Sequence, residues 1–141
     1  MTHALKLTAA LLLLAPTVWA ADPPKTNLLD FSTPALIAGD AAKKLMGENI
    51  PARVWKLFPA SKYTFISQVE GGITSGGACV VTARVMLMPL TPTTKAVLFR
   101  PQKVATTFDM LPTATAAQCT TLAQDKLIEA TTAVVSSLVK T

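Results

Sequence analysis

A chain of 141 residues with 13 lysine and arginine residues against 8 aspartate and glutamate residues is long enough for one hydrophobic core and is only mildly basic. This balance is too weak to indicate a nucleic-acid-binding protein, and we expect no nucleic acid among its partners. A single histidine and two cysteines leave little material for catalytic or metal-binding constellations.

Residues 1–20 have the layout of a secretory signal peptide. Lys6 provides the positive flank, an uncharged apolar run follows it, and small residues precede a cleavage position after Ala20. The run is much shorter than the roughly 20 residues that cross a bilayer, and Pro16 interrupts it, so a membrane anchor is the weaker interpretation. Ala21 follows the cut where bacterial lipoproteins have a cysteine. We therefore expect a periplasmic or secreted protein without a membrane anchor after cleavage.

Cleavage removes His3, the only histidine, together with Lys6. The mature chain keeps 12 of the 13 basic residues and has no side chain for a Ser-His-Asp system, a Cys-His system or a histidine metal site. Its acidic residues are scattered, which argues against a paired-carboxylate glycosidase. We predict a protein that is not an enzyme and holds no metal and no cofactor; a hydrolase built without histidine stays open as a further class.

The two cysteines, Cys79 and Cys119, allow one intramolecular pairing. In the oxidising compartment that the leader indicates, paired thiols persist as disulfides. Closing a loop of about 40 residues removes unfolded-state entropy equivalent to roughly 4 kcal/mol on the chain-entropy model. A redox pair is the weaker interpretation, because such pairs have closely spaced thiols. We therefore predict a structural disulfide between Cys79 and Cys119.

Residues 21–32 carry a pair of prolines and no periodic pattern, so we predict a flexible N-terminal arm. Thr33 followed by Pro34 indicates a helix start, and we expect a helix over residues 33–46. Residues 50–58 are ambiguous between a short helix and an irregular segment, and we favour the helix. The core-facing positions of the first helix recur every four residues: Ile37, Ala41 and Leu45.

Farther along, the period of the apolar residues changes to two, which predicts a half-buried strand over residues 62–70. A glycine-rich connection, residues 71–77, leads into a second strand over residues 78–88. We predict further strands over residues 95–100 and 103–110, completing an antiparallel meander of about four strands. The second strand has an unbroken apolar face of Cys79, Val81, Ala83, Val85 and Leu87, and the last strand places Val104, Thr106, Phe108 and Met110 on one side.

Pro112 and Thr113 open a long amphipathic helix that is expected to reach Val139. Both cysteines fall on the apolar faces of their elements, as a bridge between the last helix and the sheet requires. We predict an α+β fold, with an N-terminal helix, the meander, and a C-terminal helix packed on the sheet and disulfide-linked to it, as a single domain over residues 33–141. The apolar stripe of the last helix comprises Cys119, Ala123, Leu127, Ala130, Val134 and Leu138.

The other face of the second strand is the main candidate for a binding surface. Arg84 stands there between Thr82 and Met86, with Met88 beyond, and arginine and methionine are enriched at protein interfaces. Arg100 on the next predicted strand can join them. The candidate partner-binding residues are therefore Arg84, Met86, Met88 and Arg100; the alternative is an ordinary outer sheet face, or one covered by a helix.

Two other features are weaker candidates. The glycine-rich connection can offer backbone amides to an anion, but it joins two strands and lacks the G-K-[ST] ending of a phosphate loop, which favours a hairpin tip. Basic residues interleaved with Trp55 and Tyr63 can bind acidic protein or single-stranded nucleic acid, although a solvated face is the commoner explanation. That basic cluster comprises Lys43, Lys44, Arg53, Lys56 and Lys62.

Together these features favour a small exported, non-catalytic binding protein that acts on another exported protein. An inhibitor or immunity protein of an exported enzyme is one concrete form, because such a role needs only a small rigid scaffold. The alternative is a periplasmic carrier of a small apolar or anionic ligand held between helix and sheet, for which a closed pocket near Met86 and Phe99 would be the sign.

Overall fold

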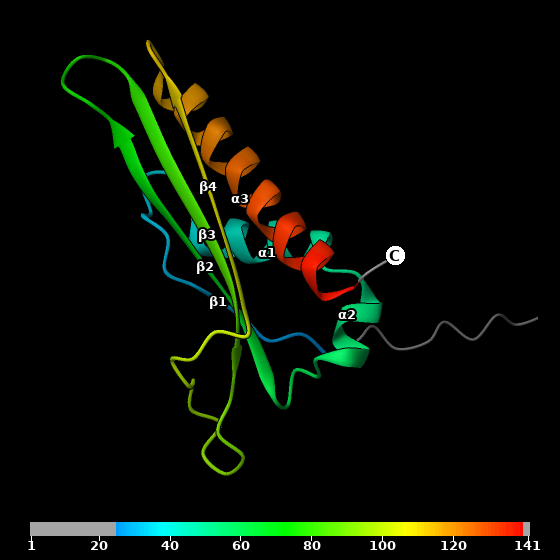
Figure 1. Ribbon diagram of the computed structural model, residues 1–141. Coiled ribbons are helices and arrows are strands. Elements are labelled where there is room, and N and C mark those ends of the chain that lie inside the picture. The colour runs from blue at the N-terminus through cyan, green and yellow to red at the C-terminus, as the bar shows by residue number, and fades with distance from the viewer. Residues whose placement is uncertain (1–24, 140–141) are drawn as a thin grey trace, which may run out of the picture.

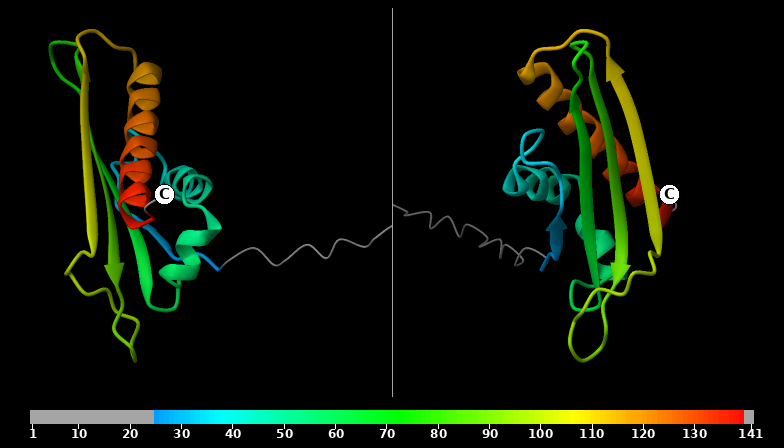
Figure 2. Two further views of the ribbon diagram at one scale, coloured as in Figure 1. Left: turned by 45° about the vertical axis from the view of Figure 1, so that its right-hand side comes forward. Right: turned by 90° about the vertical axis from the view of Figure 1, so that its left-hand side faces the viewer.

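The computed structural model describes residues 25–139, and the predicted signal peptide lies outside these residues. A four-stranded sheet in the order β1-β2-β3-β4 has helices packed on one of its faces (Figures 1 and 2). The elements are β1 Leu28–Asp30, α1 Gly39–Asn49, α2 Ala52–Leu57, β2 Tyr63–Ile73, β3 Cys79–Pro89, β4 Lys103–Leu111 and α3 Ala116–Leu138. The α+β class is confirmed.

The sheet is mixed, so the prediction of a purely antiparallel meander is wrong. β2, β3 and β4 do form antiparallel pairs, but β1 lies parallel to β2 at the other edge. In this pair, the N–H of Phe65 donates to the carbonyl oxygen of Asn27, and the N–H of Phe31 donates to that of Ser67. A stretch placed in the predicted N-terminal arm is thus the first strand of the sheet.

The strand predicted over residues 95–100 does not form. This segment belongs to the connection between β3 and β4 and makes an isolated bridge, between Leu90 and Val97. The physical reason is competition for the edge of β3, because β4 pairs with β3 from Lys103 onward and leaves no vacant strand position. Pro101 and the positive φ of Lys95, 57°, also interrupt extended backbone here.

The first helix begins later than predicted, at Gly39. The carbonyl oxygen of Thr33 accepts from the N–H groups of Leu36 and Ile37, so the Thr-Pro pair makes a turn ahead of the helix. The shift changes which face meets the core. Ile37 is buried as expected, but the helix itself buries Ala42 and Met46, while the predicted Ala41 and Leu45 are half-buried. The short helix predicted within residues 50–58 is confirmed as α2.

The long C-terminal helix and its apolar stripe are confirmed. α3 begins at Ala116, and Thr115 caps it by accepting from the N–H of Gln118 while the Gln118 side chain accepts from the N–H of Thr115. Within residues 25–139, no helix has both the length and the apolar character needed to cross a bilayer. Of the predicted stripe, Cys119, Ala123, Leu127, Ala130 and Val134 are buried and Leu138 is half-buried.

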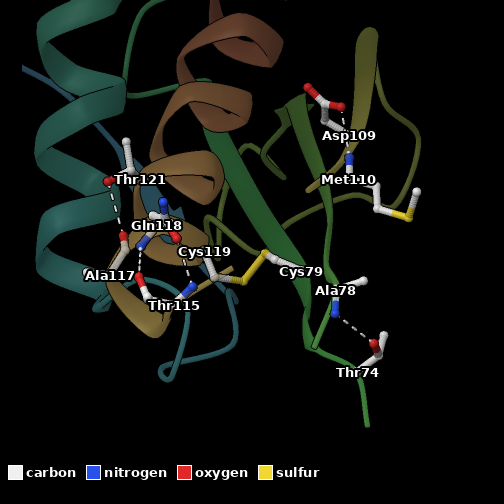
Figure 3. The surroundings of a disulfide bond; sticks show 10 residues. All are labelled: Thr74, Ala78, Cys79, Asp109, Met110, Thr115, Ala117, Gln118, Cys119 and Thr121. Atoms are coloured by element: carbon white, nitrogen blue, oxygen red, sulfur yellow. Dashed lines mark hydrogen bonds between the residues drawn. A yellow bond between two sulfur atoms is a disulfide. The ribbon is translucent and has the colours of Figure 1, made fainter. Parts of the chain in front are cut away.

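The disulfide between Cys79 and Cys119 is confirmed, with 5.5 Å between the two Cα atoms. It joins the first residue of β3 to the first turns of α3, beside the Thr115 cap (Figure 3). The bridge therefore fixes the N-terminal end of α3 over the sheet. The predicted apolar face of β3, Cys79, Val81, Ala83, Val85 and Leu87, is fully buried beneath the helices.

Candidate functional site

One face of the sheet carries no helix. In the left view of Figure 2, α1 and α3 stand on the same side of the strands. Side chains alternate between the two faces of a strand, so the residues between the buried ones on β3 point to the side away from the helices. The strand registers place partners from β2 and β4 beside them. The same side also carries Thr64, Ile66 and Met88, which are buried. We call the accessible part of this surface the outer face; it comprises Gln68, Glu70, Val80, Thr82, Arg84, Met86, Val104, Thr106, Phe108 and Met110.

Arg84 occupies the middle of the outer face. It lies opposite Gln68 on β2 and opposite Thr106 on β4. Its side chain is exposed, and it takes part in none of the ion pairs that the structure records among residues 25–139. The guanidinium donors are thus free to bind a carboxylate.

Apolar side chains flank Arg84 along the strands. On β4, Phe108 is 63% exposed, and Val104 and Met110 are each 49% exposed. Val104 lies opposite the half-buried Met86, and Met110 lies opposite the half-buried Val80. The outer face therefore combines one unpaired cation with exposed apolar contacts, which is the mixture typical of the core of a protein interface.

The structure brings together part of the predicted site. Arg84 and Met86 lie side by side on the outer face, as expected for strand neighbours. Met88 is 1% exposed and therefore cannot contact a partner without rearrangement. Arg100 is exposed, but it belongs to the connection before β4 and not to a strand. Its neighbour Phe99 is 90% exposed, so this side chain does not close a pocket of the kind a ligand carrier needs.

Sequence reasoning did not include the β4 residues in the site. Val104, Phe108 and Met110 were expected on one side of their strand, but the pattern does not say whether that side meets the helices. The sequence pattern that bears on this question is that the opposite side of the same strand carries two charged residues, Lys103 and Asp109. In the structure this more polar side faces α3, and the apolar side faces away.

An ionic cluster holds β4 to α3 behind the outer face. Lys126 Nζ lies 3.4 Å from Asp109 Oδ2 and 2.6 Å from Glu129 Oε2. A hydrogen bond from the backbone N–H of Met110, followed by one from Lys126, lowers the pKa of Asp109 below its ordinary value of 3.8. A hydrogen bond to Glu129 is the main cause that raises the pKa of Lys126 above 10.5. Thr107 Oγ1 adds a hydrogen bond to the carbonyl oxygen of Lys126, 2.8 Å long.

The basic cluster lies on α1, α2 and the segment leading into β2. Of its members, Lys56 lines a hollow of about 510 Å³, together with Trp55, and the other four do not line it. Most of the residues lining this hollow are exposed. Trp55 itself is buried and meets Phe65 edge to face, with ring centroids 5.3 Å apart. Its Nε1 is buried without a hydrogen-bond partner among the described residues. The tryptophan is therefore a core residue, and its N–H is not accessible to a ligand in the hollow.

The glycine-rich connection has a structural explanation. β2 continues to Ile73, and the reversal is a short turn in which the N–H of Thr74 donates to the carbonyl oxygen of Ala78. Gly71 has φ of 127°, and a Cβ added there would lie 2.0 Å from the carbonyl oxygen of Val80. Glycine is thus required for close approach between β2 and β3, independently of any anion.

Comparison with known proteins adds little to this description. No protein-family model matches the chain, and no curated protein matches it. Among solved structures, a Caulobacter crescentus CB15 protein described as a "putative lipoprotein" matches with 12% sequence identity and a TM-score of 0.32. The match covers 78% of this chain and 82% of that one. At this level of similarity it bears on neither the fold family nor the function of the chain.

Proposed function

We propose that this chain is an exported, non-catalytic protein that binds another exported protein through the outer face. The observation that carries the proposal is the position of Arg84, exposed and without an ion-pair partner in the described part of the chain, between the exposed apolar side chains of Val104 and Phe108. An arginine surrounded by apolar surface is a typical anchor of protein interfaces, because the partner removes water from around its charge-assisted hydrogen bonds.

Export is supported by the disulfide and by the leader pattern of residues 1–20. A buried disulfide persists in an oxidising compartment, where no cytosolic reductant reopens it. In that compartment, a small cross-linked scaffold with a rigid open sheet suits an inhibitor or immunity protein of an exported enzyme. The absence of histidine from residues 21–141 supports a non-catalytic role.

The outer face defines the chemistry of the partner surface. Arg84 requires a carboxylate or a group of carbonyl oxygens in a planar arrangement, and the β4 side chains require apolar surface around it. The mildly basic balance of the mature chain would favour approach to an acidic partner. We therefore propose a partner with an acidic side chain set in an apolar patch.

The test is capture of the partner from an envelope extract of the source cells, quantified by mass spectrometry, with four forms of the exported chain. Besides the wild type, Arg84→Glu reverses the predicted charge on the outer face, and Phe108→Ser removes the largest exposed apolar side chain of that face. Arg53→Glu is the matched control, because Arg53 is also exposed but lies on α2, on the helical side.

We expect the wild-type chain and the Arg53→Glu control to capture the same protein in near-stoichiometric amount. Arg84→Glu and Phe108→Ser should not capture it. If the captured protein is an enzyme, the wild-type chain should inhibit it, and Arg84→Glu and Phe108→Ser should not. Equal capture by wild type and Arg84→Glu would place the binding surface elsewhere.

A further inference from the structure

β4 leaves one full row of its backbone groups without a strand partner. In an antiparallel ladder, successive residues direct their N–H and C=O groups to alternate sides. The N–H of Leu90 donates to the carbonyl oxygen of Lys62, just beyond the paired part of β2 and β3. The register continues from this pair without a break, so the even-numbered residues of β3 direct their backbone groups to β2. The odd-numbered residues of β3 therefore bond to the odd-numbered residues of β4. The groups left at this edge belong to Val104, Thr106, Phe108 and Met110, of which the N–H of Met110 already donates to Asp109 Oδ1.

The opposite edge of the sheet is protected in ways that β4 is not. β1 has three residues, and Thr33 beyond it donates its N–H to the carbonyl oxygen of Val69 on β2. The carboxylate of Asp30 accepts hydrogen bonds from Ser32 and Ser67 at that edge. β4 has nine residues, no proline, and apolar side chains on the outer face. A long edge strand with exposed apolar side chains on one face is a template for pairing with another chain.

We propose that β4 of a second copy of this chain pairs with it, antiparallel, about a twofold axis at Thr106. An antiparallel pair of identical strands is self-complementary, so the contact closes as a dimer. In this register Thr106 faces Thr106 of the second copy, Val104 faces Phe108, and Lys103 faces Asp109. The residues that then face one another include Val104, Thr106 and Phe108, so the backbone hydrogen-bonding groups of these three residues are satisfied at both edges.

Charge complementarity selects this register over its neighbours. Each dimer contains two Lys103–Asp109 pairs on the helical side and two Val104–Phe108 pairs on the outer face, and both kinds of cross-strand pair are favourable. A twofold axis at Thr107 instead would place Lys103 opposite Leu111 and Asp109 opposite Ala105. The charged side chains would then have no partner across the interface.

The dimer joins the two four-stranded sheets into one continuous sheet. A twofold axis perpendicular to the sheet keeps both outer faces on the same side, so the two Arg84 side chains would line one extended surface. The inference goes beyond the proposed function and does not rest on it, since edge pairing uses backbone groups of β4 and leaves Arg84 exposed.

The test is the oligomeric state of the exported chain, measured by sedimentation velocity over a range of protein concentrations. We expect a concentration-dependent dimer. Thr106→Pro removes the N–H at the centre of the proposed contact and should abolish the dimer. The monomer should still fold, because proline is tolerated at a strand edge where the N–H faces solvent. Lys103→Glu should weaken dimerisation by about tenfold, because it replaces two attractive pairs with two repulsive ones. Lys95→Glu, an exposed charge reversal outside the strand, should leave it unchanged.

Cross-linking gives a second readout that does not depend on disruptive variants. Since both native cysteines are bonded, Thr106→Cys introduces a single reactive thiol, and a short bismaleimide should link two copies through it. Thr121→Cys on the exposed side of α3 is the control and should remain uncross-linked. A monomer at every concentration, or a dimer that persists in a folded Thr106→Pro variant, would overturn the inference. Arg84→Glu should remain dimeric, so loss of partner capture by that variant would report on the proposed function alone.

Discussion

Replacing the disulfide by alanines, Cys79→Ala/Cys119→Ala, should lower the free energy of unfolding by about 4 kcal/mol. The two cysteines are 40 residues apart in the chain, and opening a loop of that length returns conformational entropy to the unfolded state on the chain-entropy model. Alanine is preferred to serine because both positions are buried, where a hydroxyl group would lack a partner. Against a total stability of about 5–15 kcal/mol for domains, the loss is large.

The assay is urea unfolding at equilibrium, followed by circular dichroism, of three samples: oxidised wild type, wild type reduced in denaturant and refolded with reductant present, and the alanine variant. In a thermal melt, the melting temperature of the alanine variant should lie about 15 °C below that of oxidised wild type, for a domain of this size. The dependence of the unfolding free energy on urea should steepen, because the unfolded chain without the loop exposes more surface.

The comparison of samples separates loop entropy from packing. Reduced wild type keeps both sulfur atoms in the core, so its loss reports on the loop, and any additional loss in the alanine variant reports on the missing sulfur contacts. Equal urea midpoints for oxidised and reduced wild type would refute the reasoning, since the bridge would then contribute nothing to the stability of the domain.

Three further outcomes follow from particular contacts, each read as a change in unfolding free energy. Gly71→Ala should lose about 2 kcal/mol or more because its Cβ would strike a β3 carbonyl, whereas Gly72→Ala, which has a positive φ but open space, should lose less; equal losses would contradict the clash. Met46→Ala should cost about 3 kcal/mol and the half-buried Leu45→Ala clearly less, and the reverse order would contradict the position of α1. For Asp109→Asn, the lowered pKa means that wild type is the more stable protein above the ordinary carboxyl pKa of 3.8, and that the difference disappears as the pH falls through the folded-state pKa; a difference that persists in acid would contradict the charge interaction.

Long periodic patterns in the sequence predict the elements that form the core. β3 buries the whole of its predicted apolar face, and β2 and α3 bury most of theirs. Both cysteines lie on these buried faces, so the apolar periodicity and the disulfide pairing agree. β1 could not be predicted in this way. It has three residues, and its extended state depends on hydrogen bonds with β2, such as that from Phe65 to Asn27, which no local pattern reveals.

The errors elsewhere have the same origin in long-range competition. Residues 95–100 have the composition of a strand, but β4 already occupies the edge of β3. The Thr33-Pro34 pair has the composition of a helix start, but it makes a turn, and the helix that follows is displaced so that Met46 faces the core. Local propensity in both segments yields to the pairing and packing available in the folded chain.

The candidate site depends on a fact that alternation cannot supply, namely which face of each strand the helices cover. On β3 the more apolar face lies inside, as the hydrophobic effect requires. On β4 the order is reversed, because Lys103 and Asp109 share the side that faces α3, while Phe108 and Met110 face away from it. Side chains that are half or more exposed, such as Phe108, contribute less to the stability of the monomer than they would if they were buried. Their burial would stabilise a complex instead, so the reversed pattern of β4 is a reason to look for binding partners on this face and at this edge.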